Sequence, residues 1–147
     1  MTVAIRPYRE ADHRATARLW LASWRSTGLA VAQLATEDGL FDRIPQELAA
    51  GWEAHLAWEE GESVGFLALR PASGHLHQLF VAPEAQGRGI GRMLLDFAKT
   101  RLPDGLWLHT AAENLRTCRF YERNGLRRGE SRTHPTLGHP ILTYHWP

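Results

Sequence analysis

The sequence has one cysteine and no long apolar run, and each scarcity excludes a class of protein. Cys118 has no second cysteine to pair with, so a disulfide-stapled secreted scaffold is excluded and a reducing, cytoplasmic setting is expected. A stretch of about 18 consecutive apolar residues is missing, which predicts no transmembrane helix and no membrane partner. Residues 2–7 lack the apolar region of a secretory signal peptide.

Neither sign of charge is in large excess. The chain has 17 Lys and Arg against 16 Asp and Glu, a net charge of +1, so no nucleic-acid partner is expected. The apolar fraction of 44% and the charged fraction of 22% are ordinary for soluble globular proteins. The 147 residues show no repeat and no linker, and they predict a single domain over 1–147.

Hydrophobic periodicity and turn residues predict an α/β (α+β) chain in which strands and helices are interleaved. Strands are expected at 3–7, 55–58, 64–69, 75–81, 106–109, 127–132 and 141–146. Helices are expected at 12–28, 88–101 and 114–124. Gly39 and Pro45 interrupt residues 31–50, which are therefore expected to form two short helical pieces around a mobile segment.

The most informative stretch is the glycine-rich segment that joins the end of a strand to the start of a helix. A helix start exposes unpaired N–H groups and the positive end of the helix dipole, and both favour a phosphate-bearing ligand. Glycines remove side chains that would keep a pyrophosphate away from the backbone. A glycine-rich turn without a ligand is the alternative interpretation. The segment reads Gln86, Gly87, Arg88, Gly89, Ile90, Gly91, Arg92.

Two other phosphate-binding motifs do not fit this segment. A P-loop ends in Gly-Lys-Ser/Thr, which the chain lacks. A dinucleotide fingerprint needs Gly-x-Gly-x-x-Gly early in a strand–helix–strand unit, and the spacing from Gly87 to Gly91 is different.

Two segments together resemble the Gcn5-related N-acetyltransferase (GNAT) family. Gln86, Gly89 and Gly91 match that family's motif A, Gln/Arg-x-x-Gly-x-Gly/Ala. Residues 114–126 resemble its Asn-x-x-Ala-x-x-Phe-Tyr-x-x-x-Gly-Phe segment, with Cys118 and Leu126 as departures. The order of the expected elements also agrees with the family over nearly the whole chain.

The resemblance implies a fold and an activity. The implied GNAT-like fold is a central mixed, mostly antiparallel sheet of about seven strands, with helices on both faces and a splayed pair of parallel strands. The implied activity transfers the acetyl group of acetyl-coenzyme A (acetyl-CoA), a cosubstrate, to a primary amine of a small molecule or peptide. The family usually achieves this by direct attack in a ternary complex. No metal is expected, and whether the chain forms a homodimer stays open.

The resemblance also implies which residues hold the coenzyme. The backbone of the strand before the glycine segment would bind the pantetheine arm through Leu79, Phe80 and Val81. The pyrophosphate would be cradled by Gln86, Gly87, Arg88, Gly89, Ile90, Gly91 and Arg92. Asn114 would contact the coenzyme arm or cap the helix that follows it.

Tyr121 is the implied general acid, because a tyrosine at this motif position points toward the coenzyme sulfur in many family members. Its ordinary pKa near 10 leaves the hydroxyl protonated at neutral pH. The alternative is a core aromatic, which is the expectation for Phe120. Cys118 is expected to be a buried thiol and not a nucleophile.

His75 and His77 are candidates for the general base. They lie two apart on a strand and so share a face, and an ordinary histidine pKa near 6.5 suits proton removal. A surface or core role is the alternative for each. A metal site is not expected, because no third ligand is suitably spaced.

Trp24, Arg25, Ser26 and Phe41 are the candidates for binding the acceptor amine. They offer aromatic walls and one cation that could pair with a carboxylate, although helical spacing favours a core role over a site role for Trp20 and Trp24. Antibiotics, polyamines, amino acids and protein N-termini all stay open as acceptors, and the lack of an acidic run disfavours a polyamine. A non-catalytic acyl-CoA sensor with the same fold, or a binding module with no coenzyme site, is the alternative to an enzyme.

Overall fold

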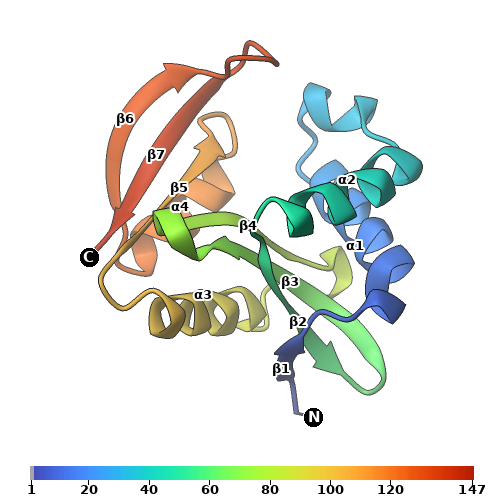
Figure 1. The fold of residues 1–147 in the computed structure, drawn as a ribbon. Coiled ribbons are helices and arrows are strands. Elements are labelled where there is room, and N and C mark those ends of the chain that lie inside the picture. The colour runs from blue at the N-terminus through green and yellow to red at the C-terminus, as the bar shows by residue number, and fades with distance from the viewer. Residues whose placement is uncertain (1) are drawn as a thin grey trace.

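A computed structural model describes residues 2–147 and contains a seven-stranded sheet in the order β1-β2-β3-β4-β5-β7-β6 (Figure 1). Its strands are β1 (Ala4–Pro7), β2 (Glu53–Glu59), β3 (Glu62–Arg70), β4 (His75–Val81), β5 (Leu106–Ala111), β6 (Arg127–Thr133) and β7 (Pro140–Trp146). Neighbouring strands are antiparallel except for β4 and β5, which are parallel. The expected mixed sheet with one parallel pair is confirmed.

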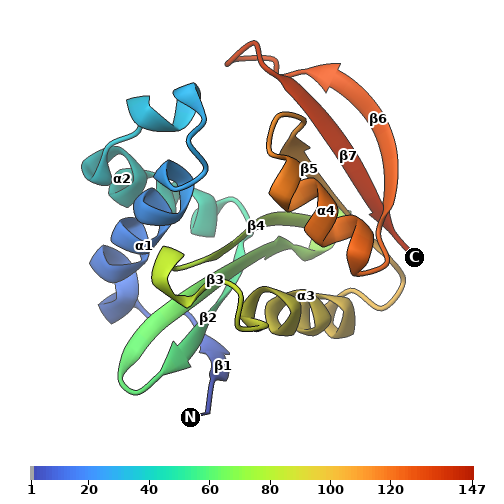
Figure 2. The ribbon, with the colours of Figure 1, turned by 180° about the vertical axis from the view of Figure 1, so that it is seen from behind.

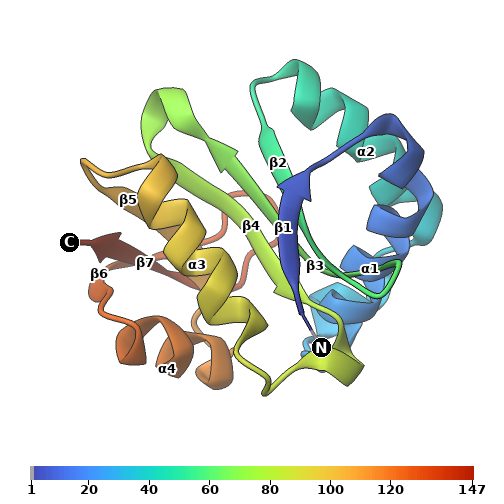
Figure 3. The ribbon, with the colours of Figure 1, turned by 90° about the horizontal axis from the view of Figure 1, so that it is seen from below.

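The helices lie on both sides of the sheet, as expected. They are α1 (His13–Arg25), α2 (Glu37–Ala49), α3 (Ile90–Arg101) and α4 (Leu115–Arg123). Figure 3 shows α1 and α2 on one side of β1 to β4 and α3 on the other. Figure 2 shows α4 beside β5 and β7, so β5 to β7 form a second wing that diverges from the first.

Strand β3 is buried on both faces because helices cover both of its sides. Every residue from Val64 to Leu69 is buried, which explains why this stretch is continuously apolar and does not alternate. On the α1 side, four aromatic rings pack with centroids 5.1 to 5.9 Å apart, from Trp20, Trp52, Phe66 and Phe80. Such contacts between rings add to the stability that burial supplies.

On its other face, β3 makes a close approach to α3. A Cβ atom added at Gly65 would lie 2.9 Å from Leu94 Cδ1 and 3.3 Å from Ile90 Cγ2. The missing side chain therefore lets the first turns of α3 settle onto the sheet. Because the glycine-rich segment leads directly into this helix, the contact also fixes where that segment lies.

The expectation for residues 31–50 is wrong in part. A 3-10 turn covers Ala30–Leu34, but a single helix, α2, runs through both Gly39 and Pro45. Proline cannot donate to the carbonyl four residues earlier, which here belongs to Phe41. That carbonyl instead lies 2.6 Å from His13 Nε2 of α1. This contact between helices replaces the lost backbone hydrogen bond, and α2 continues.

Among residues 2–147, no helix is both long and apolar enough to cross a bilayer.

The close approach at Gly65 generates a stability prediction. Gly65→Ala should lower the free energy of unfolding by about 1 to 3 kcal/mol, the usual cost of overpacking a core. Leu94→Val in the same chain should recover part of the loss, because it removes the nearest methyl group, and a double-mutant cycle from urea unfolding measures the coupling. Ser63→Ala, on the same strand, is the control. Equal stability of the Gly65 and Ser63 variants would contradict this account.

Candidate functional site

A cleft opens where β4 and β5 separate. The two strands pair at a single position, His75 with Trp107, whereas β4 stays paired with β3 along its length to Val81. Beyond His75, the edge of β4 therefore presents backbone groups that β5 does not use. The resulting cleft has a volume of about 1240 Å³, above the roughly 300 to 1,000 Å³ of ordinary ligand pockets. It has room for an extended cosubstrate and an acceptor.

A β-bulge shapes β4 at this point. Leu76 and Gln78 pair with Leu69 and Ala68, which are adjacent in β3, so His77 is an extra residue in β4. A bulge twists and bends its strand, and bulges are frequent beside active sites. Here it accompanies the divergence of β4 from β5.

One end of the cleft is formed by the glycine-rich segment. Gly87 and Gly89 adopt left-handed φ values of 81° and 84°, which glycine alone adopts at little cost. Gly89 is the N-cap of α3, and no side chain caps this helix start, so its N–H groups stay available to a ligand. The predicted coenzyme residues that line the cleft are Leu79, Phe80, Val81, Gln86, Gly87, Gly89, Ile90, Gly91, Arg92 and Asn114.

Arg88 is the exception among the predicted coenzyme residues. Its guanidinium donates to both carboxylate oxygens of Glu59, at 2.9 and 2.5 Å, and it is absent from the cleft lining. The ion pair raises the pKa of Arg88 and lowers that of Glu59, the hydrogen bond being the main cause in both. Arg88 therefore anchors the loop to β2, and the prediction that it faces the phosphates is corrected.

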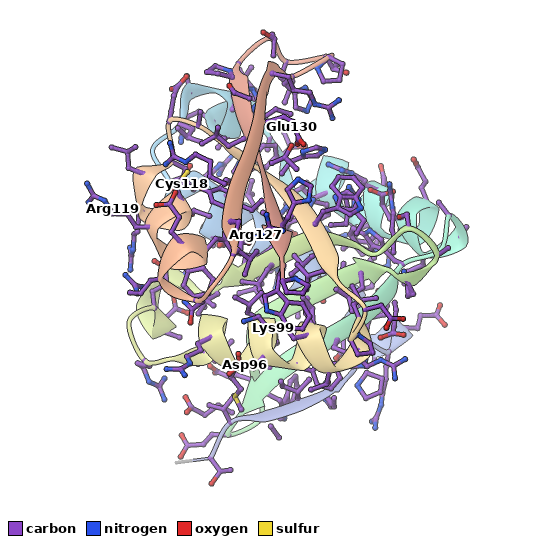
Figure 4. All side chains as sticks on the ribbon, turned by 90° about the vertical axis from the view of Figure 1, so that its left-hand side faces the viewer. Asp96, Lys99, Cys118, Arg119, Arg127 and Glu130 are labelled. Atoms are coloured by element: carbon purple, nitrogen blue, oxygen red, sulfur yellow. The ribbon has the colours of Figure 1, made fainter. Side chains whose placement is uncertain are left out.

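Further cations line this end of the cleft that the motif comparison missed. Three arginines lie at positions i, i+3 and i+7 on one face of α4, and that spacing was the available signal. Figure 4 shows Lys99 on α3 and Arg119 on α4, with Arg119 reaching outward from its helix. With the predicted Arg92, the cleft lining contains several positive side chains: Arg92, Lys99, Arg116, Arg119 and Arg123. Lys99 is partly engaged, since its Nζ donates to the Asn124 carbonyl at 2.9 Å.

Tyr121 lies at the inner wall of the cleft. Its side chain is 5% exposed, and burial raises its pKa above the ordinary value, so the hydroxyl stays protonated. Asn114 accepts a hydrogen bond from the backbone N–H of Thr117 at 3.2 Å, so it caps α4 and fixes the start of the helix that carries Tyr121. Phe120 is half-buried and lines the cleft. The expectation of a buried thiol at Cys118 is confirmed.

The expected pKa near 6.5 is wrong for both candidate bases. His75 is 8% exposed and stacks on Trp107 with ring centroids 3.8 Å apart. Burial lowers the pKa of His75 to about 3, assisted by repulsion from His77 and His109. Burial likewise lowers the pKa of His77 to about 4. Both rings are therefore neutral, weak bases at physiological pH.

The hydrogen bonds of His77 also fix its tautomer. Trp52 Nε1 lies 2.7 Å from His77 Nδ1, and the indole nitrogen can only donate. His77 Nδ1 must therefore be the acceptor, and the proton of the neutral ring lies on Nε2. His77 can offer a hydrogen bond to a ligand through Nε2, but it has no free lone pair with which to remove a proton.

The predicted acceptor residues are brought together only in part. Trp24 and Ser26 line the cleft, whereas Arg25 donates to the carbonyl of Ala35 at 2.9 Å and lies outside the lining. Phe41 also lies outside it and stacks on His13, with ring centroids 3.5 Å apart. The acceptor role predicted for Arg25 and Phe41 is thus corrected, because both side chains hold α1 and the residues around α2 together.

The second wing adds residues to the cleft lining that sequence reasoning did not name. His109 of β5 and Arg132 of β6 line the cleft, as do His134 and His139 at the ends of the connection from β6 to β7. No motif spacing marks them, because they meet only when β5, β6 and β7 pair. Among residues 2–147, no cluster of three or more histidines, cysteines or acids is arranged to hold a metal ion.

The sequence is similar to that of a known acetyltransferase. A peptidyl-lysine N-acetyltransferase, YjaB of Salmonella typhimurium, is 33% identical over 91 residues, which cover 62% of this chain and 58% of that protein. The chain thus spans less than two thirds of this relative's length.

Solved structures show the same fold. An acetyltransferase from Thermus thermophilus superposes with a TM-score of 0.80 at 22% identity, covering 100% of this chain and 97% of the other. The PaiA N-acetyltransferase of Thermoplasma acidophilum, solved in complex with coenzyme A, gives a TM-score of 0.75 at 18% identity and covers 97% and 98%. The profile of the acetyltransferase (GNAT) family matches residues 17–126. The chain therefore belongs to the GNAT acetyltransferase family.

Proposed function

We propose that the protein transfers the acetyl group of acetyl-CoA to a primary amine by direct attack in a ternary complex. One observation carries the proposal: the unpaired edge of β4, the uncapped start of α3 and the buried Tyr121 all face one cleft. The relative named as a peptidyl-lysine N-acetyltransferase supports an amine acceptor, and the relative solved with coenzyme A supports the donor.

The cleft has the chemical groups that coenzyme A requires. The free edge of β4 offers backbone N–H and C=O groups to the amides of the pantetheine arm. The N–H groups after Gly89 and the positive end of α3 suit the pyrophosphate. The cations along α3 and α4, Arg92 and Arg119 among them, suit the remaining phosphate charge.

Acetyl transfer makes two demands on the chain's own residues. The thiolate that leaves must receive a proton, and Tyr121 holds one at neutral pH, since its ordinary pKa near 10 already lies above neutrality and burial raises it further. The proton that the amine nitrogen loses as the amide forms would then return to Tyr121. The amine must arrive neutral, and neither His75 nor His77 is a strong enough base to deprotonate an ammonium ion. We therefore propose that the amine enters as its free base. The two rings would then serve as neutral walls, His77 with a proton on Nε2.

The first prediction concerns coenzyme binding. Acetyl-CoA should raise the melting temperature of the wild type, because it binds the folded state. Gly89→Glu should abolish that increase by placing a negative side chain at the phosphate site. Gly61→Glu is the matched control, since Gly61 has the similar φ of 81° and equally open surroundings but lies outside the cleft. A normal increase in a folded Gly89→Glu protein would sink the coenzyme assignment.

The second prediction concerns the acid. Tyr121→Phe should reduce kcat about 10²-fold, the low end for general acid catalysis, with the affinity for acetyl-CoA unchanged. Thiol release in the presence of a competent amine measures it. Tyr144→Phe is the matched control, because Tyr144 is fully buried and its hydroxyl donates to Glu122 at 2.6 Å. That variant should lose stability and keep turnover. Wild-type thiol release by Tyr121→Phe would return Tyr121 to a packing role.

The third prediction concerns pH. Since the pKa values of His75 and His77 are about 3 and 4, neither ring changes charge between roughly pH 5 and 9. kcat/KM should therefore rise with pH according to the pKa of the acceptor amine, with no step near 6.5. His75→Ala should leave the shape of this profile unchanged. A step near 6.5 in the wild type that disappears in His75→Ala would identify His75 as the base.

A further inference from the structure

The part of the cleft lined by the second wing through His109, Arg132, His134 and His139, here called the acceptor end, contains an arginine that no carboxylate neutralises. Arg132 lies on β6, and one of its guanidinium nitrogens is 3.0 Å from His109 Nε2 on β5. Among residues 2–147, no acidic side chain lies within the 4.0 Å ion-pair distance of Arg132. Both Arg132 and His109 line the cleft. A guanidinium in a cleft with no acidic partner is suited to bind an anion.

His109 holds Arg132 in place through a fixed tautomer. Arginine only donates hydrogen bonds, so His109 Nε2 must be the acceptor and the ring proton must lie on Nδ1. That nitrogen is 3.3 Å from Thr143 Oγ1 on β7. His109 pairs directly with Thr143, and Arg132 with Ile141, which places all these side chains on one face. The contacts among β5, β6 and β7 thus fix the orientation of the Arg132 guanidinium.

The other cleft arginine near the acceptor end is already neutralised. Arg43 donates to Glu47 at 3.2 Å and its guanidinium lies over the Trp20 ring. Glu130, two residues before Arg132, could have been a competing partner. Its carboxylate is instead 3.4 Å from His145 Nε2, and Figure 4 marks its position on the second wing. Arg132 is therefore left for a ligand.

Carboxylates are almost absent from the lining of the cleft. Among the described residues, Asp96 is the sole acid that lines it, and it lies on α3, 3.8 Å from Arg92 at the coenzyme end. The acceptor end thus offers no counter-ion to an acceptor with several ammonium groups. Its remaining wall is apolar and is built by Trp24, Leu29, Val31, Leu137 and Ile141.

We propose that the acceptor is an amine that carries a carboxylate in the same molecule, and that Arg132 binds that carboxylate. The proposal rests on the proposed acetyl transfer and names its substrate class. Arg132 becomes the specificity-determining residue, and His109 is its positioning residue. A free amino acid and a peptide with an acidic residue beside its amine share this chemistry, and the experiment separates these two sources.

The experiment compares acceptors that differ only in charge. One arm sets free amino acids with apolar side chains against their carboxamides and their decarboxylated amines. The other arm sets lysine peptides with aspartate neighbours against the same peptides with asparagine neighbours. kcat/KM for acetyl-CoA-dependent thiol release should favour the carboxylate member by about 10- to 100-fold in the arm that contains the true substrate, the usual value of a charged hydrogen bond.

Variants assign that preference to Arg132. Arg132→Met should remove it by slowing only the carboxylate member, with KM for acetyl-CoA unchanged, and Arg132→Lys should keep part of it. His109→Leu should weaken it, whereas His109→Gln, which can still accept from Arg132, should restore it. Arg127→Met is the matched control on the same strand, since Arg127 contacts the Pro147 carbonyl and lies outside the cleft.

The outcomes separate this proposal from the proposed function. Equal or better use of the uncharged acceptors, or the same losses in the Arg132 and Arg127 variants, would overturn the carboxylate proposal while acetyl transfer stands. If no amine is acetylated, the proposed function fails. In that case the anion site is tested separately, by calorimetry of the binding of the carboxylate and carboxamide ligands to the coenzyme A-loaded protein. A preference for the carboxylate that Arg132→Met abolishes would support the anion site, and its absence would reject it.

Discussion

The divergence of β4 from β5 after one residue pair determines where everything else in the site lies. A continuous parallel ladder would use the backbone groups of β4 and close the cleft. Because pairing ends at His75 and Trp107, the free edge of β4 faces the space between the two wings. Under the proposed function, the coenzyme lies at the glycine-rich end of this cleft and the acceptor at the end lined by the second wing.

Burial then sets the protonation state of the groups along the cleft. It raises the pKa of Tyr121 and lowers the pKa values of His75 and His77, so all three are uncharged at neutral pH. The opposite directions have one cause, since a desolvated site disfavours the charged form of acids and bases alike. An uncharged wall suits a reaction that needs a neutral amine and a proton donor. It also leaves Arg132 as the fixed charge at the acceptor end.

Local sequence patterns predicted the elements whose causes are local. The glycine segment could be predicted because Gly87 and Gly89 adopt a left-handed backbone conformation that glycine allows at little cost. The strand before it was recognisable from its own residues. The course of α2 through Pro45 was not predictable in this way. It depends on His13, 28 residues away along the chain, reaching the Phe41 carbonyl. The prediction for the Arg88 side chain was wrong because it too depends on a distant residue: its partner, Glu59, lies on β2.

The acceptor site was the least predictable part because its charges are decided by pairing across the fold. Sequence reasoning chose Arg25 for its place near aromatic residues, but tertiary contacts turn it toward the Ala35 carbonyl. Arg132 carried no signal, and it differs from the other arginines only in what surrounds it. A guanidinium contributes to recognition when neighbours orient it without neutralising it. His109 meets that requirement, since its lone pair accepts a hydrogen bond and carries no negative charge. In the proposed acceptor site, specificity would therefore depend on a neutral histidine that holds a charged arginine.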